Sequence, residues 1–284
     1  MLKKVNTVLL GLAVLLTVGC GKDDPEPDQS GNLPVAAARN CQLISASSHV
    51  YGYAYEYEYN AAGQITKAIL TSPLTYLSNY DVVEYNSIGL LSKVTKYKPD
   101  NVFLEYRVYE YTADSLIKKD TKYTRTDPAD STYIGPFSFN EYSYDASKRL
   151  TKITYYSSDQ PATPRGITSY TYRPDGSILE ELTGNTLNSL GTATEYWFTN
   201  SKAPVQKVAY FNLRETLKAP SAGIIFNKVP ATIRQTNYDN NGNVSSQYTF
   251  NYTYTHNADG YPVIQAMGNP GQQPLINTWA YNCQ

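Results

Sequence analysis

The chain has 284 residues and carries 24 Lys or Arg against 25 Asp or Glu, which gives a formal net charge of −1. With charges this balanced and no basic stripe along the sequence, we expect no nucleic-acid partner. Tyrosine is the unusual residue, at 28 Tyr against 7 Phe. It favours strands, where one ring face packs while the hydroxyl reaches water.

The N-terminal segment 1–19 has the three parts of a secretory signal. It begins with two lysines, continues with an apolar run over residues 8–18 and ends in Gly19, directly before Cys20. A transmembrane helix, the alternative, needs about 20 apolar residues, and this run is shorter. The segment resembles the lipobox of bacterial lipoproteins, although Thr17 stands where Leu is commonest in that family. The resemblance implies that residues 1–19 are a signal peptide and that Cys20 carries lipid.

Residues 20–40 are acidic and rich in proline, so we expect a flexible tether. The run Cys20-Gly21-Lys22-Asp23-Asp24 resembles the lipoprotein export signal of Bacteroidetes, which implies the outer face of the outer membrane. The alternative is an ordinary acidic tether on a periplasmic protein. Several acyl chains, each worth ~0.8 kcal/mol per buried CH2, would hold the protein on a membrane leaflet. The membrane is therefore an expected partner, through the anchor.

Residues 41–284 are long enough for one large β domain, or for two small ones. With Cys20 assigned to lipid, Cys41 and Cys283 remain, at the two limits of this domain and in an oxidising compartment. We expect a disulfide between them, which requires their Cα atoms to lie within ~7 Å. The alternative is two separate buried thiols.

The domain repeats a short unit in which a tyrosine is followed four places later by glycine. The clearest copies are Tyr59 with Gly63, Tyr85 with Gly89, Tyr172 with Gly176, and Tyr238 with Gly242. Ser115 and Lys148 replace the glycine in two copies, and looser copies start at Phe198 and Tyr254. A type I turn followed by a left-handed glycine predicts a β-hairpin with a G1 bulge. The two copies without glycine predict a strained or differently shaped turn.

No sustained 3.6-residue period follows the signal, so we expect almost no helix beyond one short turn over Leu213–Lys218. Eight hairpins predict roughly fourteen to eighteen strands, more than an open twisted sheet holds. The predicted fold class is therefore all-β, an antiparallel meander of repeated β-hairpins curled into a flattened barrel or rolled sandwich. The Tyr-turn-Gly turns are expected on one rim and the longer connections on the other, where binding residues would lie. Those connections are 124–136, 157–166, 183–192, 212–231 and 265–277.

This repeat resembles the YD repeat of RHS-type proteins, and the whole chain resembles a family of uncharacterised Bacteroidetes lipoproteins with such repeats. RHS proteins use the repeat to build a β-sheet shell. This chain is too short to enclose a toxin and lacks the associated cleavage domain. The resemblance therefore implies an architecture and no activity.

Groups with catalytic chemistry are few. His49 and His256 are the only histidines, and neither a metal-ligand spacing nor a P-loop, dinucleotide or Gly-x-Ser-x-Gly motif occurs. We expect no metal, no cofactor and no enzyme activity. Glu56 and Glu58 share a strand face and could meet the spacing of glycosidase carboxylates, whereas the adjacent Glu180 and Glu181 point to opposite faces. Two short runs resemble the O-glycosylation sites of Bacteroidetes, Asp114-Ser115-Leu116 and Asp130-Ser131-Thr132.

Three classes of function remain open. The first, which we expect, is a non-enzymatic outer-membrane or surface lipoprotein with a structural or protein-interaction role. The second is a glycan-binding accessory lipoprotein that uses exposed aromatic rings, with Trp197 and Trp279 as candidate contacts. The third is a hydrolase, which requires a pocket that brings two carboxylates together.

Overall fold

In the computed structural model, the described residues are 41–48, 52–125, 133–184, 190–202, 228–268 and 274–283. They form sixteen strands and one 3-10 turn, η1 (Thr75–Leu77). None of them belongs to a helix long and apolar enough to cross a membrane. The strands are β1 (Cys41–Ser48), β2 (Tyr53–Tyr59), β3 (Ile65–Thr71), β4 (Asn79–Tyr85), β5 (Leu91–Tyr97), β6 (Phe103–Tyr111), β7 (Ile117–Arg125), β8 (Ile134–Tyr144), β9 (Leu150–Ser157), β10 (Gln160–Tyr172), β11 (Ile178–Gly184), β12 (Leu190–Lys202), β13 (Lys228–Tyr238), β14 (Val244–His256), β15 (Pro262–Met267) and β16 (Leu275–Cys283).

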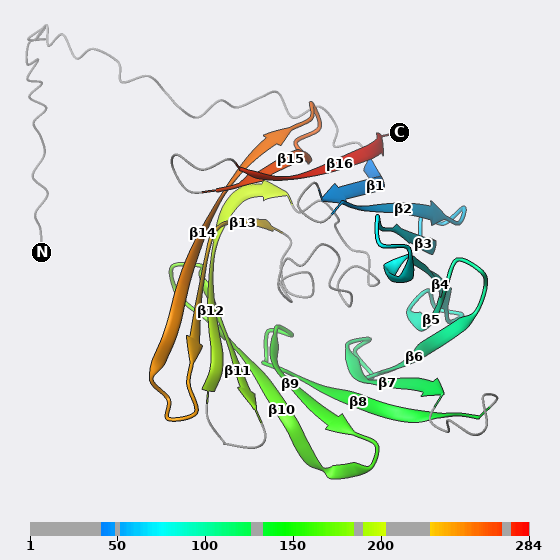
Figure 1. Cartoon of the computed structure of the whole chain (residues 1–284), viewed down its shortest axis with the longest axis horizontal. Coiled ribbons are helices and arrows are strands. Elements are labelled where there is room, and N and C mark those ends of the chain that lie inside the picture. The colour runs from blue at the N-terminus through cyan, green and yellow to red at the C-terminus, as the bar shows by residue number, and fades with distance from the viewer. Residues whose placement is uncertain are drawn as a thin grey trace, which may run out of the picture. The chain divides into compact units, whose positions relative to one another are not determined.

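The sheet is a closed antiparallel barrel. Each strand pairs with its neighbours in the sequence, and β1 also pairs with β16, so the strands follow one another around a ring (Figure 1). This confirms the predicted all-β meander and its number of strands. The helical turn expected over Leu213–Lys218 lies outside the described residues.

The repeat units form tight turns of one geometry. In the first, the N–H of Gly63 donates to the carbonyl of Asn60 at 2.9 Å, and the Asn60 side chain accepts from the N–H of Ala62 at 3.0 Å. Gly63 then has φ 75°, which glycine adopts without strain. Ser115 and Lys148 hold the same conformation, at φ 62° and 61°. Their turns therefore keep the common shape. The backbone is strained at these two residues, because they carry side chains at positive φ.

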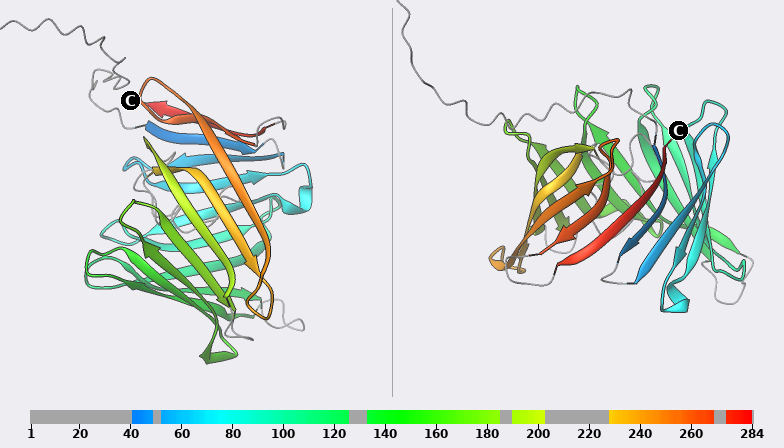
Figure 2. Two further views of the ribbon diagram at one scale, coloured as in Figure 1. Left: turned by 90° about the vertical axis from the view of Figure 1, so that its left-hand side faces the viewer. Right: turned by 90° about the horizontal axis from the view of Figure 1, so that it is seen from above.

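The turns divide between two rims. The cysteine rim holds Cys41, Cys283 and the turns after β2, β4, β6, β8, β10 and β14, whereas the far rim holds η1 and the turns after β5 and β13 (Figure 2). The expectation that all Tyr-turn-Gly turns share one rim is therefore wrong for Tyr238–Gly242. The unit that begins at Phe198 uses β12 and β13 as its two strands, so Tyr238 ends a second strand instead of a first one.

Two of the predicted long connections also differ. β9 ends at Ser157 and β10 begins at Gln160, so most of 157–166 is strand. Register shifts on both sides of Pro164 accommodate this proline within the strand, since proline is tolerated at bulges. Residues 228–231 begin β13 at the cysteine rim and not at the far rim, whereas 212–227 lie outside the described residues.

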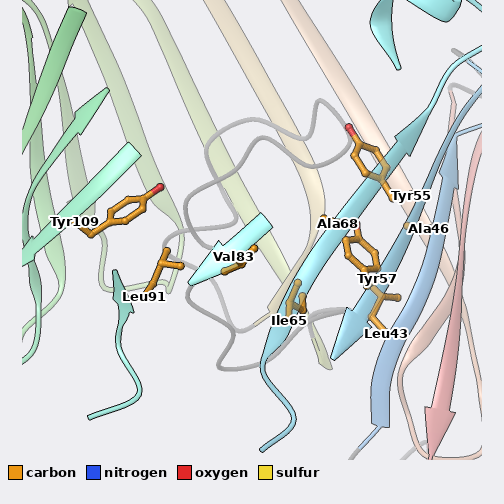
Figure 3. Packing of buried hydrophobic residues seen from close by; sticks show 9 residues of the cluster. All are labelled: Leu43, Ala46, Tyr55, Tyr57, Ile65, Ala68, Val83, Leu91 and Tyr109. Carbon is orange, nitrogen blue, oxygen red and sulfur yellow. The ribbon is translucent and has the colours of Figure 1, made fainter. Parts of the chain in front are cut away.

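Tyrosine and aliphatic side chains point to the inside of the barrel. On β1–β6 they form a buried cluster of Leu43, Ala46, Tyr55, Tyr57, Ile65, Ala68, Val83, Leu91 and Tyr109 (Figure 3). A second cluster on β9–β13 contains Leu150, Ile153, Tyr170, Ile178, Tyr196 and Ile233. The apolar residue that follows each turn begins the second strand, and in this position both Ile65 and Leu91 are completely buried.

Tyrosine hydroxyls join each hairpin to the preceding one. Tyr85 on β4 donates to the carbonyl of Ile65 on β3 at 2.9 Å, and Tyr111 on β6 donates to the carbonyl of Leu91 on β5 at 2.7 Å. The same bond, from an even-numbered strand to the strand before it, links Tyr59 to Leu43, Tyr144 to Ile117, Tyr172 to Leu150, Tyr254 to Pro230 and Tyr281 to Pro262. In β12 the equivalent residue is Phe198, which has no hydroxyl.

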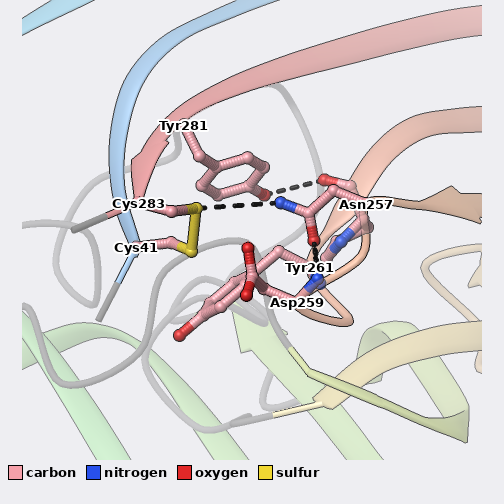
Figure 4. The surroundings of a disulfide bond; sticks show 7 residues. Cys41, Asn257, Asp259, Tyr261, Tyr281 and Cys283 are labelled. Carbon is pink, nitrogen blue, oxygen red and sulfur yellow. Dashed lines mark hydrogen bonds between the residues drawn. A yellow bond between two sulfur atoms is a disulfide. The ribbon is translucent and has the colours of Figure 1, made fainter. Parts of the chain in front are cut away.

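The barrel closes where β1 meets β16. Their first residue pair is the predicted disulfide between Cys41 and Cys283, whose Cα atoms are 4.1 Å apart (Figure 4). Beside it, Asn257 Nδ2 lies 3.9 Å from Cys283 Sγ, and the Tyr281 hydroxyl donates to the Pro262 carbonyl at 2.7 Å. A disulfide that closes so long a loop stabilises by up to about 5 kcal/mol in the chain-entropy description.

Replacing Gly176 by Val should lower the free energy of unfolding by about 1–2 kcal/mol, because a β-branched residue is strained at positive φ. Gly176 has φ 82°, and a Cβ there would meet no atom within 4 Å, so backbone strain alone is measured. Ser115→Gly, the reverse change in an equivalent turn, should stabilise. Urea unfolding of the disulfide-bonded protein compares the two; an unchanged midpoint for Gly176→Val would contradict the turn geometry.

Tyr111→Phe removes one hydroxyl bond between hairpins and leaves the Leu91 carbonyl without this donor. We expect a loss of about 1 kcal/mol in the free energy of unfolding. Tyr248→Phe is the matched control, because the Tyr248 side chain is 52% exposed and its change should have no effect. Equal stability of Tyr111→Phe and the unchanged protein would mean that the hydroxyl does not hold the hairpins together.

Candidate functional site

The inner wall carries a network of polar groups on β6, β7 and β8. Asp120 is 1% exposed. Its Oδ1 accepts from Arg107, and its Oδ2 accepts from Asn140 at 3.0 Å and from Tyr142 at 2.6 Å. A buried carboxylate is tolerated when opposite charge and hydrogen bonds compensate it. Both oxygens of Asp120 are so compensated, and the network ties three neighbouring strands together.

Glu105 lies on the same face of β6 between two lysines. Lys122 Nζ is 2.6 Å from one carboxylate oxygen, and Lys96 Nζ is 3.7 Å from the other. Burial raises the pKa of Glu105, but the hydrogen bond from Lys122 and the nearby positive charges outweigh burial, so the pKa lies below its usual value. Glu105 is therefore an ionised partner of two lysines, which is unsuited to general acid catalysis.

The outer wall is charged and polar. Glutamate and lysine face each other at the same position of three successive hairpins, as Glu58 with Lys67, Glu84 with Lys93, and Glu110 with Lys119. The first two of these pairs have N–O distances of 3.6 and 3.3 Å. The outward row of β14 consists of Ser245, Gln247, Thr249, Asn251, Thr253 and Thr255, all exposed.

This outer wall differs from the wall of a membrane-spanning barrel. There the outward residues form an apolar band about 25 Å tall, and an outward Lys or Arg at the bilayer midplane costs about 2–4 kcal/mol. Here the apolar rows and most tyrosines point inward, and the charged pairs point outward. The described wall therefore suits water on its outside.

Aromatic rings also occur on the outer wall, near the far rim, as stacked cross-strand pairs. These are Tyr80 with Tyr97, Tyr106 with Tyr123, and Phe139 with Tyr156, with ring centroids 5.2, 4.7 and 4.6 Å apart. Lysines lie over rings of these pairs, with Lys67 Nζ 5.0 Å from the Tyr80 centroid and Lys119 Nζ 4.2 Å from that of Phe139. Neighbouring side chains thus cover ring faces that a sugar would need for stacking.

Among the described residues, most of the exposed large apolar side chains lie at the far rim. On the three successive connections from β3 to β8 these are Leu74, Tyr76, Val102, Tyr133, Ile134 and Phe137, which are 38–76% exposed. We call these six residues the rim patch. Exposed apolar side chains that gather in one region of a protein surface mark an interaction site. The rim patch is therefore the candidate functional surface.

The two tryptophans lie on opposite faces of the wall. Trp197 is on the outside, half-buried, with the Arg234 guanidinium 5.2 Å from its ring centroid. Trp279 packs against the inner cluster that contains Leu43. The structure therefore does not bring the two candidate glycan contacts together on one platform.

The structure also does not bring the predicted carboxylates and His256 together in one site. Glu56 and Glu58 are exposed on the outer wall, and Glu58 is paired with Lys67. Glu180 is buried inside the barrel while Glu181 points outward, as expected. His256 is exposed at the end of β14, with its ring 6.3 Å from that of Tyr254.

Some predictions fall on residues that the structure does not describe, namely Cys20, His49 and Ser131. Ser115 is exposed in the turn after β6. Among the described residues, Cys41, Asp259 and Cys283 bring three potential metal-ligand atoms within 4.8 Å of one another. Their two sulfur atoms are bonded to each other and so are not thiolate ligands.

The chain is similar to solved structures, whereas no protein-family model and no curated protein matches it. A porin-like protein from Bacteroides uniformis superposes with a TM-score of 0.51 at 15% identity, over 85% of this chain and 96% of that one. The two proteins share a fold. A porin-like protein from Bacteroides vulgatus gives a TM-score of 0.42 at 12% identity, over 86% of this chain and 99% of that one. TcdB2-TccC3 without its hypervariable C-terminal region gives 0.30 at 14% identity, over 81% of this chain and 13% of that one.

One turn of the repeat geometry was missed in the sequence. Lys98–Asn101 on the far rim has the same backbone hydrogen bonds, with Asn101 at φ 65°. The signal was present, because Asn101 follows Tyr97 by four residues as Gly63 follows Tyr59. Asparagine is the side chain that best tolerates this conformation after glycine.

Stability should fall at alkaline pH because of the buried tyrosines. Burial raises the pKa of Tyr85, Tyr111 and Tyr144 to about 12, against about 10 in an unfolded chain. The folded protein holds these protons more tightly, so the stabilisation is complete below pH ~10 and is lost as the pH rises through ~12. Near-ultraviolet absorbance of tyrosinate and circular dichroism should change together. Ionisation of every tyrosine near pH ~10 in a folded protein would contradict the burial.

Proposed function

We propose that this chain is a non-enzymatic lipoprotein whose barrel stands in water at the outer membrane, facing the cell surface, with a structural or protein-interaction role. The observation that carries the proposal is the polar outer wall of a chain that also has a lipobox-like N-terminus. Charged pairs such as Glu84 with Lys93 would be costly in hydrocarbon. Acyl chains on Cys20, not the barrel wall, would then hold the protein at the membrane.

The rim patch supports an interaction role, and the inner wall gives no support to catalysis. Glu105 and Asp120 are engaged by Lys96, Lys122 and Arg107, and these contacts join neighbouring strands. The porin-like description of the Bacteroides uniformis protein is consistent with a place at the outer membrane. We give the glycan-binding alternative less weight, because ring faces of the outer aromatic pairs are covered.

A variant without the lipid anchor tests whether the acyl chains or the barrel wall hold the protein at the membrane. In a variant, residues 1–20 are replaced by an ordinary cleavable signal, so that the mature chain starts at Gly21. The unchanged protein should stay in the membrane fraction until detergent is added, and the variant should be recovered in the soluble fraction. A folded variant that still needs detergent would mean that the barrel itself is inserted, and the proposal would be wrong.

Two further readouts complete this test. Radiolabelled palmitate should be incorporated into the unchanged protein and not into Cys20→Ala. Protease added to intact cells should digest the protein if the barrel faces the medium. A protein that is labelled but protected until the outer membrane is opened would place it on the periplasmic face instead.

A further inference from the structure

The residues of the rim patch form two groups along the far rim, with one turn between them. Leu74 and Tyr76 lie in the connection before β4, and Tyr133, Ile134 and Phe137 lie at the start of β8. Midway between them is the turn that joins β5 to β6. Successive connections on one rim are two strands apart, which is about 10 Å. The two apolar groups therefore lie at similar distances on either side of one turn.

That middle turn presents two opposite charges. Lys98 and Asp100 are both exposed, and neither makes an ion pair within the described residues. Asp100 Oδ1 accepts the N–H of Val102 at 3.3 Å, which leaves its second oxygen directed to no protein donor among those residues. The order along the rim is thus apolar group, charged pair, apolar group.

We propose that the rim patch is the contact between two copies of this chain in a twofold-symmetric dimer. In such an interface both copies contribute the same surface, and a rotation of 180° exchanges one copy with the other. With the axis at the turn between β5 and β6, Tyr76 of one copy faces the partner's Phe137, and the reverse. Lys98 then faces the partner's Asp100 twice, so the patch is complementary to itself.

A second copy fits this surface better than other occupants. The sixteen described strands close into a ring without a free edge, so their association has to use side chains. A bilayer would have to accept the carboxylate of Asp100 at the centre of the patch, which is unfavourable. The six side chains expose on the order of 500 Å², which is below the ~800 Å² per partner of a standard interface. The dimer should therefore be weak and should depend on concentration.

Charge reversal tests the symmetry directly. Purified protein, in detergent if it is lipidated, is followed by sedimentation velocity over a range of concentrations. The unchanged protein should show a monomer–dimer equilibrium. Lys98→Asp and Asp100→Lys should each weaken the dimer at least tenfold, because like charges would then meet at the axis. A mixture of these two variants should dimerise again, because every pair across the axis is once more opposite.

Controls separate this effect from folding. Lys118→Asp changes an exposed lysine at the other end of the barrel and should leave the equilibrium unchanged, whereas Phe137→Ser should weaken the dimer while circular dichroism stays the same. A monomer at every concentration, or a mixture no tighter than either variant alone, would overturn the proposal. A monomer that instead binds vesicles of phosphatidylethanolamine and phosphatidylglycerol would also overturn it. None of these outcomes depends on whether Cys20 carries lipid.

Discussion

The hydrogen bond from a tyrosine hydroxyl to the backbone of the preceding hairpin is the interaction on which the barrel depends. Near each repeat turn the ladder to the next hairpin stops short: β3 pairs with β4 only from Leu70 to Lys67, so the backbone of Ile65 has no ladder partner on β4. The next hairpin supplies a donor at this place, as Tyr85 does for Ile65. The most regular residue of the repeat is thus the one that connects the repeats, and its ring also builds the inner cluster.

Local chemistry made much of this fold predictable. A glycine four places after tyrosine, strict alternation and a cysteine at each end of the domain led to the hairpins, the number of strands and the disulfide. The rim of Tyr238–Gly242 was not predictable in this way, because it depends on how many strands precede it. The rim patch was not predictable either, since Tyr76 and Phe137 lie on the same rim only because of the strands that separate them along the sheet.

The inner network illustrates a second limit. Asp120 lies in the run Ile-Lys-Lys-Asp-Thr-Lys-Tyr, where charged residues occupy both faces of the strand and no pattern says which point inward. Only the pairing of Asp120 with Tyr109 and Asn140 shows that it faces the core. On the inner wall, Asp120 and Glu105 are each shared among neighbouring strands, and on the outer wall Glu58 and Glu84 each pair with one lysine of the same hairpin.

The pairing of β1 with β16 has a consequence for the order of assembly. All other strands pair with their neighbours in the sequence, so fifteen of the sixteen ladders form from local segments, which folds quickly for a β protein. The closing ladder joins residues 242 positions apart. If the chain folds from its N-terminus, β1 presents an unpaired edge until the last strand forms, and such an edge is prone to aggregation. A chain that lacks β16 (Leu275–Cys283) would keep that edge, so the C-terminal strand protects the first strand as much as it completes the ring.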